Sequence, residues 1–246
     1  MENMESDYRN LFREVSPSVV LVEQVGHTNN FCIGSVILNE GESTFILTGS
    51  KLLDLSANLS VTFSNGCKQP ATPLIISEKL CILMTKLYQK CKVIEFFSGD
   101  INHTYAAAIA PATKSSVYKL PCFVIHKSLE TGTPYSEDVT EGSQDSFTFQ
   151  CLYGDRGPNG VSRLMCGPVF NMEGKVLGFV SDDMEYKFHP KGNDGQIVHG
   201  DYYVKIGYSL KIGTCASILQ KRLGDLVGDV DWKKGLLKAK AQGAPY

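Results

Sequence analysis

The sequence predicts an all-β chain built in two β-rich halves, with a short helix towards each end. The first observation is a series of short runs rich in β-branched and aromatic residues, which recur at regular spacing. The second is the turn chemistry between these runs, of which Asn65-Gly66 is the clearest case. The third is a hydrophobic content of 43% over 246 residues, which suits one or two domains with a real core.

The first half opens with an amphipathic helix. Apolar residues at helical spacing predict this helix over residues 5–15, and Ser16-Pro17 ends it. Strands are expected at 19–25, 31–38, 44–48, 59–63, 74–77 and 80–87. The pattern weakens from residue 88 to residue 116. Within that region 106–110 fits one strand, and 112–116 is the expected linker between the halves.

The second half is expected to contain its own set of strands. These are residues 121–125, 146–151, 168–171, 175–180 and 202–206. Residues 187–200 read as a long exposed loop, and 207–223 is expected to end in a helix of about ten residues. For 224–246 we expect a frayed, solvated tail. The alternative is that Trp232 to Ala241 form a basic amphipathic segment for an acidic partner.

Composition limits the classes of partner. The formal net charge of -2 gives no overall attraction to nucleic acid or membrane, and the sequence contains no nucleic-acid-binding motif. No apolar run approaches the roughly 20 residues needed to span a bilayer. Residues 1–15 are polar and lack the apolar core of a signal peptide. We therefore expect a cytoplasmic or nuclear protein.

The eight cysteines show no Cys-x-x-Cys pair and no His/Cys cluster with zinc spacing. In a reducing compartment they are most simply buried thiols. No phosphate-binding loop or dinucleotide-binding fingerprint is present. We expect neither a metal site nor a cofactor.

Residues 165–179, read from Met165-Cys166-Gly167-Pro168 through a hairpin at Glu173-Gly174, carry a resemblance to a known family. The segment resembles the turn of trypsin-like serine proteases, most closely the HtrA/Deg branch, where it reads Gly-x-Ser-Gly-Gly-Pro. If Gly167-Pro168 matches the last Gly-Pro, Cys166 takes the place of a glycine and Met165 that of the nucleophilic serine. A thioether has no proton to give up and cannot serve in acyl transfer.

The resemblance extends over roughly residues 15–223 and implies two six-stranded antiparallel β-barrels. The implied domains are an amino-terminal helix (1–16), a first barrel (17–112), a second barrel with its terminal helix (113–223), and a tail (224–246). The family's base follows the form apolar-Thr-x-x-His, and its place is taken by Lys51. Its carboxylate position is taken by Lys79. A protonated ammonium donates hydrogen bonds without accepting them, so it cannot act as the base.

These replacements imply a protease homologue without its catalytic triad, which acts by binding a protein or peptide segment. Lys51, Lys79, Arg163 and Met165 are the expected binding residues of the cleft, and the lysines favour an acidic segment. Two alternatives remain open. One is an active peptidase that uses Cys166 or a non-standard site, since a thiolate is a competent nucleophile. The other is a scaffold that forms homo-oligomers through the amino-terminal helix.

Overall fold

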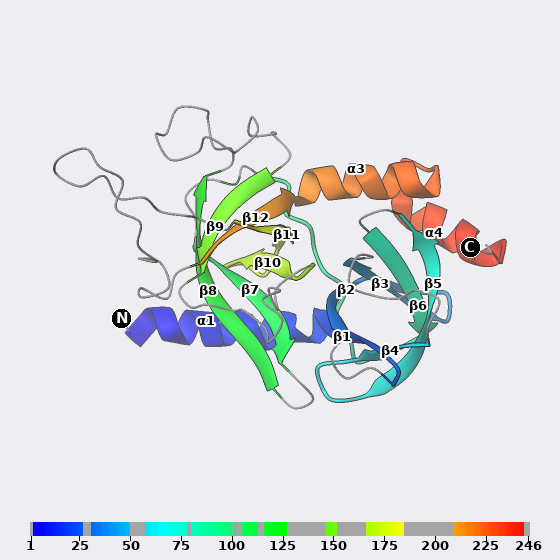
Figure 1. Ribbon diagram of the computed structural model, residues 1–246, viewed down its shortest axis with the longest axis horizontal. Coiled ribbons are helices and arrows are strands. Elements are labelled where there is room, and N and C mark those ends of the chain that lie inside the picture. The colour runs from blue at the N-terminus through cyan, green and yellow to red at the C-terminus, as the bar shows by residue number, and fades with distance from the viewer. Residues whose placement is uncertain are drawn as a thin grey trace.

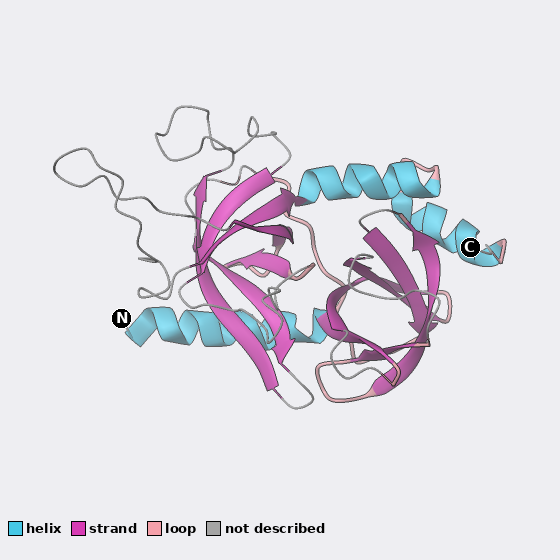
Figure 2. Cartoon of the chain, in the orientation of Figure 1, coloured by secondary structure: helices cyan, strands magenta, loops and turns pink. Residues whose placement is uncertain are grey.

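The structure is a computed structural model that describes residues 2–26, 31–49, 58–77, 80–99, 101, 105–112, 116–126, 146–151, 166–184 and 209–243. Two β-sheets lie next to each other, with helices along their outer sides (Figure 1). Strands dominate the described residues, as Figure 2 shows, and this confirms that the chain is mostly β.

Six strands of the first half form a closed antiparallel barrel. They are β1 (Val19–Gln24), β2 (Phe31–Glu40), β3 (Ser43–Gly49), β4 (Leu59–Thr62), β5 (Lys68–Ile76) and β6 (Leu80–Lys86). The strand order is β1-β2-β3-β6-β5-β4, and β4 pairs back to β1. Alternate side chains of each strand point inward. They meet in one hydrophobic cluster that draws on all six strands: Val20, Val22, Cys32, Val36, Ile46, Leu59, Val61, Ala71, Cys81 and Leu83.

All six strands expected in this half are present, but β5 begins at Lys68 rather than at residue 74. Two prolines, Pro70 and Pro73, hid its first part, because proline lacks the N–H that a strand ladder needs. The pairing of β5 with β6 is irregular between Pro73 and Ile75, where a bulge accommodates the proline. The barrel thus tolerates the prolines by local distortion.

The second sheet also has six strands. They are β7 (Tyr105–Ala112), β8 (Ser116–His126), β9 (Ser146–Cys151), β10 (Pro168–Asn171), β11 (Val176–Met184) and β12 (Ser209–Cys215). Their pairing order is β10-β11-β12-β9-β8-β7, and β7 also pairs with β10. The strands expected at 121–125, 146–151, 168–171 and 175–180 all fall within this set.

One expectation about this half needs correction, one is confirmed, and two lie beyond the described residues. The expected linker at 112–116 is the connection between β7 and β8, so β7 belongs to the second sheet and the change of sheet comes before Tyr105. The helix expected at the end of 207–223 is confirmed and begins at Ala216, directly after β12. The strand expected at 202–206 and the loop expected at 187–200 lie outside the described residues.

The amino-terminal helix is confirmed as α1 (Glu2–Val15), which begins earlier than residue 5. Its apolar face is buried at Tyr8, Leu11 and Val15, all part of the larger hydrophobic cluster. A 3-10 turn, η1 (Ser16–Ser18), follows, and the hydroxyl of Ser18 donates to the carbonyl oxygen of Val15 at 2.6 Å. The helix therefore docks on its own chain and leads directly into β1.

The expectation of a frayed tail after residue 223 is wrong. Helix α3 (Ala216–Val227) ends at Gly228, whose φ of 65° gives the left-handed C-cap that glycine favours. Helix α4 (Trp232–Ala241) follows, with Asp231 as its N-cap. Trp232 and Leu236 are buried, so α4 is held by apolar contacts that its many lysines concealed in the sequence.

The connection between the halves, residues 87–101, is bonded to both. The N–H of Ile94 donates to Val36 in the first barrel at 2.9 Å. The N–H of Val176 in the second sheet donates to Glu95 at 2.7 Å, and that of Phe97 donates back to Val176 at 2.9 Å. The connection therefore fixes the two sheets to each other through backbone hydrogen bonds.

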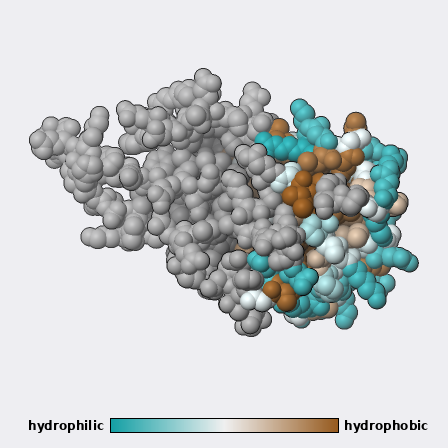
Figure 3. Space-filling model, turned by 45° about the vertical axis from the view of Figure 1, so that its right-hand side comes forward, coloured by the Kyte–Doolittle hydropathy of each residue, from teal (hydrophilic) through white to brown (hydrophobic). Residues whose placement is uncertain are grey.

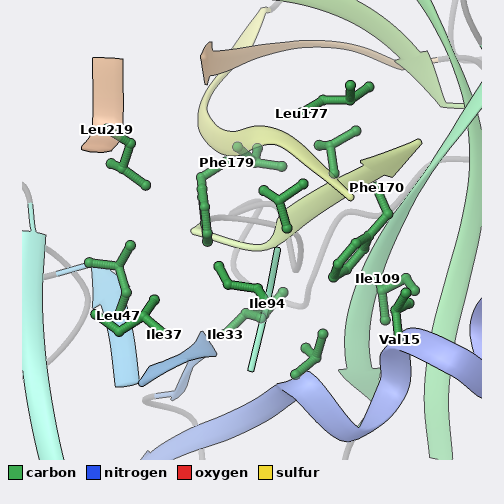
Figure 4. Packing of buried hydrophobic residues seen from close by; sticks show 14 of the residues in the cluster. Val15, Ile33, Ile37, Leu47, Ile94, Ile109, Phe170, Leu177, Phe179 and Leu219 are labelled. Atoms are coloured by element: carbon green, nitrogen blue, oxygen red, sulfur yellow. The ribbon is translucent and has the colours of Figure 1, made fainter. Parts of the chain in front are cut away.

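The larger hydrophobic cluster fills the space between the sheets (Figure 4). Ile33, Ile37 and Leu47 of the first barrel contribute from one side, and Phe179 and Leu219 contribute from the other. A shared apolar core of this kind makes the two halves one folding unit, because neither can separate without exposing it.

Candidate functional site

The ends of strands β3 and β6 lie next to each other, and each is close in sequence to a position expected to replace a catalytic residue. Gly49, the last residue of β3, is paired with Leu80, the first residue of β6. Lys51 comes two residues after Gly49, and Lys79 comes directly before Leu80. Both lysines lie outside the described residues, and the structure describes only the strand ends near them in sequence.

Two polar side chains fix this end of the barrel. The hydroxyl of Thr48, which is buried, donates to the carbonyl oxygen of Ile33 at 2.8 Å. Ser77, after β5, is hydrogen-bonded to Leu80, the first residue of β6. The Ser77 hydroxyl accepts from the N–H of Leu80 at 3.1 Å, and the N–H of Ser77 donates to the Leu80 carbonyl oxygen at 2.8 Å. The ends of β3 and β6 are thus held in a defined register.

The turn before β10 is the third part of the site. Cys166 has a φ of 64°, in the left-handed region that favours glycine. Its N–H donates to the carbonyl oxygen of Val180 at 3.0 Å, and the N–H of Val180 donates to Gly167 at 2.9 Å. Cys166 is partly exposed, which differs from the buried thiol expected as the simplest case. Arg163 and Met165 lie outside the described residues.

The hairpin expected at Glu173-Gly174 is confirmed. The side-chain oxygen of Asn171 accepts from the N–H of Glu173 at 3.1 Å and from that of Lys175 at 2.9 Å. Gly174 has a φ of 77°, as the turn requires. This hairpin joins β10 to β11 and holds the Cys166 turn against Val180.

Six cysteines whose side chains the structure describes are free thiols: Cys32, Cys67, Cys81, Cys91, Cys166 and Cys215. Burial raises the pKa of Cys81 to about 12, so its thiol stays protonated and unreactive at neutral pH. Burial also raises the pKa of Cys91, against the opposing effect of its hydrogen bonds. Neither thiol has the lowered pKa of an activated nucleophile.

A row of aromatic side chains leads away from the Cys166 turn. Phe179, one residue before Val180, lies 6.5 Å from Phe96 between ring centroids. Phe96 in turn meets Trp232 edge to face, at 6.1 Å and 83°. The sequence analysis missed this row. The signal available was the single tryptophan of the chain at helical spacing from Leu236.

In the described part of the chain, no three His, Cys, Asp or Glu side chains are grouped to hold a metal ion. No helix among the described residues is both long and apolar enough to cross a membrane. In the coloured, right-hand part of Figure 3, hydrophilic residues lie around a smaller hydrophobic area. Among the described side chains, the large exposed hydrophobic residues are Val25, Ile76, Tyr105 and Val230, which come from separate places along the chain. Singly exposed residues of this kind do not define an interface.

No protein-family profile matches this sequence, and no curated protein matches it. Solved structures do. The inactive form of the Rv3671c protease superposes with a TM-score of 0.57 at 14% identity, over 88% of this chain and 92% of that one. The inactive form of a serine-to-alanine mutant of Rv3671c from M. tuberculosis H37Rv superposes with a TM-score of 0.56 at 14% identity, over 88% and 89%. At this identity the likeness establishes the fold alone, and that fold is the one of trypsin-like serine proteases.

Proposed function

We propose that this chain is a catalytically inactive homologue of the trypsin-like serine proteases, of HtrA/Deg type, that binds a protein or peptide segment without cutting it. On this proposal the second sheet, like the first, is a barrel of the two-barrel architecture. The cleft between the barrels is the binding site, and Lys51, Lys79, Arg163 and Met165 lie along it.

The observation that carries the proposal is the pairing of Gly49 with Leu80. This register supports the assignment of positions 51 and 79 to the same end of the barrel, where the motif comparison puts the family's histidine and aspartate. The chain has lysine at both positions. Two ammonium groups supply positive charge where a protease needs a base and a carboxylate.

The left-handed Cys166 gives independent support. Its φ of 64° is one that glycine adopts readily, in keeping with the alignment that puts Cys166 on a family glycine. The same alignment puts Met165 on the serine.

Binding is tested with a library of fluorescent decapeptides, half acidic and half neutral, measured by anisotropy at low and physiological salt. The proposal predicts that acidic peptides bind more tightly and that added salt weakens them. The double variant Lys51→Glu/Lys79→Glu should lose the preference. A matched variant, Lys233→Glu/Lys234→Glu, makes the same charge change on α4 and should keep it. Equal binding of acidic and neutral peptides would remove the case for an acidic partner.

A peptidase that uses Cys166 is the competing function. Iodoacetamide and fluorophosphonate probes, followed by mass spectrometry, separate the two. The proposal predicts that the fluorophosphonate labels no residue. It also predicts that iodoacetamide labels Cys166 no faster than an ordinary, partly exposed thiol. Rapid labelling of Cys166, together with peptide hydrolysis that Cys166→Ala abolishes, would establish the peptidase instead.

The remaining expectations are proposals as well. A homo-oligomer through α1 requires a surface other than Tyr8, Leu11 and Val15, because these are buried within the chain. Light scattering of the chain with and without residues 1–16 measures the oligomeric state. A cytoplasmic or nuclear location stays a prediction, to be read from a fluorescent fusion of the full chain.

A further inference from the structure

Helix α4 contacts the first barrel and the connection between the two halves. Towards the second sheet, Trp232 packs edge to face on Phe96 of the connection. Towards the first barrel, the ammonium of Lys240 donates to the carbonyl oxygen of Gly41, in the turn between β2 and β3. Leu237 lies over the same turn, since a methyl group on Gly41 would be 3.5 Å from its Cδ2. The carboxy-terminal helix therefore joins the first barrel to the connection.

The contacts continue from Phe96 to the candidate site. Phe96 bridges to Val176 of β11 and packs on Phe179, three residues further along. The next residue, Val180, exchanges both of its backbone hydrogen bonds with the Cys166-Gly167 turn. An unbroken series of packed rings and hydrogen bonds thus joins α4 to the turn.

Helix α4 depends on its docking contacts for stability. It has ten residues, fewer than the 12 to 15 or so that make an isolated helix marginally stable, so it depends on docking. It is joined to α3 through Gly228, which has no side chain to pack. Its ion pair, Lys238 with Asp229 at 2.7 Å, leaves 66% of the lysine side chain exposed. Exposed pairs contribute little, so docking rests on the apolar contacts of Trp232, Leu236 and Leu237.

We propose that α4 is a releasable strap whose docking on Phe96 keeps the Cys166-Gly167 turn in its observed conformation. When α4 is docked, Trp232 holds Phe96 against Phe179 and so holds β11 against the turn. When α4 is released, Phe96 loses its support and the hydrogen bonds between Val180 and the turn open more often. The role as a regulator of the site rests on the proposed function, whereas the coupling is a property of the fold that needs no substrate.

Native-state hydrogen exchange of the full chain tests the coupling. Amides are followed by NMR at increasing, subdenaturing guanidinium, at Gly235 in α4 and at Cys166 and Val180 in the site. The proposal predicts that all three exchange through one opening that lies below global unfolding. The coupling is wrong if the Gly235 amide exchanges through an opening below global unfolding while the Cys166 and Val180 amides exchange only through global unfolding. It is also wrong if α4 itself opens only globally.

Substitutions give the second test. Trp232→Ala should speed exchange at Gly235 and at Cys166 and Val180 by about tenfold, which corresponds to about 1.4 kcal/mol. Lys234→Ala, on the exposed side of the same helix, should change none of them. In a Phe96→Leu background, Trp232→Ala should still free α4 but should no longer affect the turn. If Trp232→Ala in the wild-type background speeds exchange in α4 but not in the turn, then α4 only covers the surface beneath it and is not coupled to the site. Neither result bears on the peptide-binding assay, so the two proposals fail separately.

Discussion

The N–H of Cys166 donates to the carbonyl oxygen of Val180 at 3.0 Å, and this bond holds a non-glycine residue at a φ of 64°. A left-handed backbone costs an ordinary L-residue roughly 1 to 2 kcal/mol. The surrounding hairpin must therefore compensate for the strain at this position. Such strain persists where neighbouring structure over-determines it.

Substitutions at Cys166 should reveal this strain. A β-branched residue tolerates the left-handed region least, so Cys166→Val should lower the free energy of unfolding by about 1 to 2 kcal/mol relative to Cys166→Ala. Cys166→Gly should be at least as stable as Cys166→Ala, because glycine adopts this φ without steric cost. Guanidinium denaturation of the three variants measures the series.

A matched pair at Thr72, an exposed residue of β5, serves as the control. Extended backbone favours valine over alanine, so the order at Thr72 should be the reverse of the order at Cys166. If valine and alanine were equally stable at Cys166, the left-handed turn would not describe the protein in solution.

Docking of α4 should contribute substantially to stability. Leu236 is fully buried, so Leu236→Ala should lower the free energy of unfolding by about 2 to 5 kcal/mol through lost burial and the cavity left behind. Lys234→Ala, exposed on the same helix, should change it by less than about 0.5 kcal/mol. The fluorescence of Trp232, the chain's only tryptophan, reports undocking directly. Equal stability of the two variants would mean that α4 is not docked and that the expectation of a solvated tail was right.

The buried thiol of Cys81 predicts a dependence of stability on alkaline pH. Its pKa is raised to about 12 in the folded state, from an ordinary value of 9.0. The folded chain therefore keeps a proton that the unfolded chain gives up, and the stabilisation is complete below pH 9 and lost as the pH rises towards 12. Cys81→Val removes the group. Its stability should fall less steeply than that of the wild type between pH 8 and pH 10, and parallel slopes would contradict the burial of this thiol.

Gly178 in β11 should be intolerant of any side chain. A Cβ there would lie 2.0 Å from the carbonyl oxygen of Thr214 in β12 and 2.5 Å from the ring of Phe147. Gly178→Ala should therefore cost about 3 kcal/mol or more, since overpacking forces neighbouring backbone to move. Gly66→Ala, at a turn with open space around it, should cost about 1 kcal/mol from its positive φ alone. Equal effects would mean that β11 and β12 are not paired as described.

The strands of the first barrel were predictable because their apolar runs are bounded by clear turn residues, as at Asn65-Gly66. The start of β5 was not, because Pro70 and Pro73 argue locally against a strand that its neighbours impose. The membership of β7 in the second sheet was hidden for another reason. Its alanines, Ala106, Ala107 and Ala108, carry no alternation, and only pairing with β8 and β10 assigns them.

The candidate site was predictable where it follows the backbone. The hairpin at Glu173-Gly174 and the turn at Cys166-Gly167 lie where the motif resemblance expects them. The anchoring of α4 was not predictable in this way, because Trp232 lies in a lysine-rich segment that reads as solvated. Its partner Phe96 is more than 130 residues away in sequence, and no local pattern links the two.

The most direct measurement is hydrolysis of a complex peptide library, read by mass spectrometry, for the wild-type chain and for a variant with Lys51→His, Lys79→Asp and Met165→Ser. The account predicts that the wild type releases no new peptide termini above a buffer control. Any cleavage by the triple variant would add support for the three assigned positions. Cleavage by the wild-type chain that follows one sequence preference and disappears on substitution of a single residue would contradict the account.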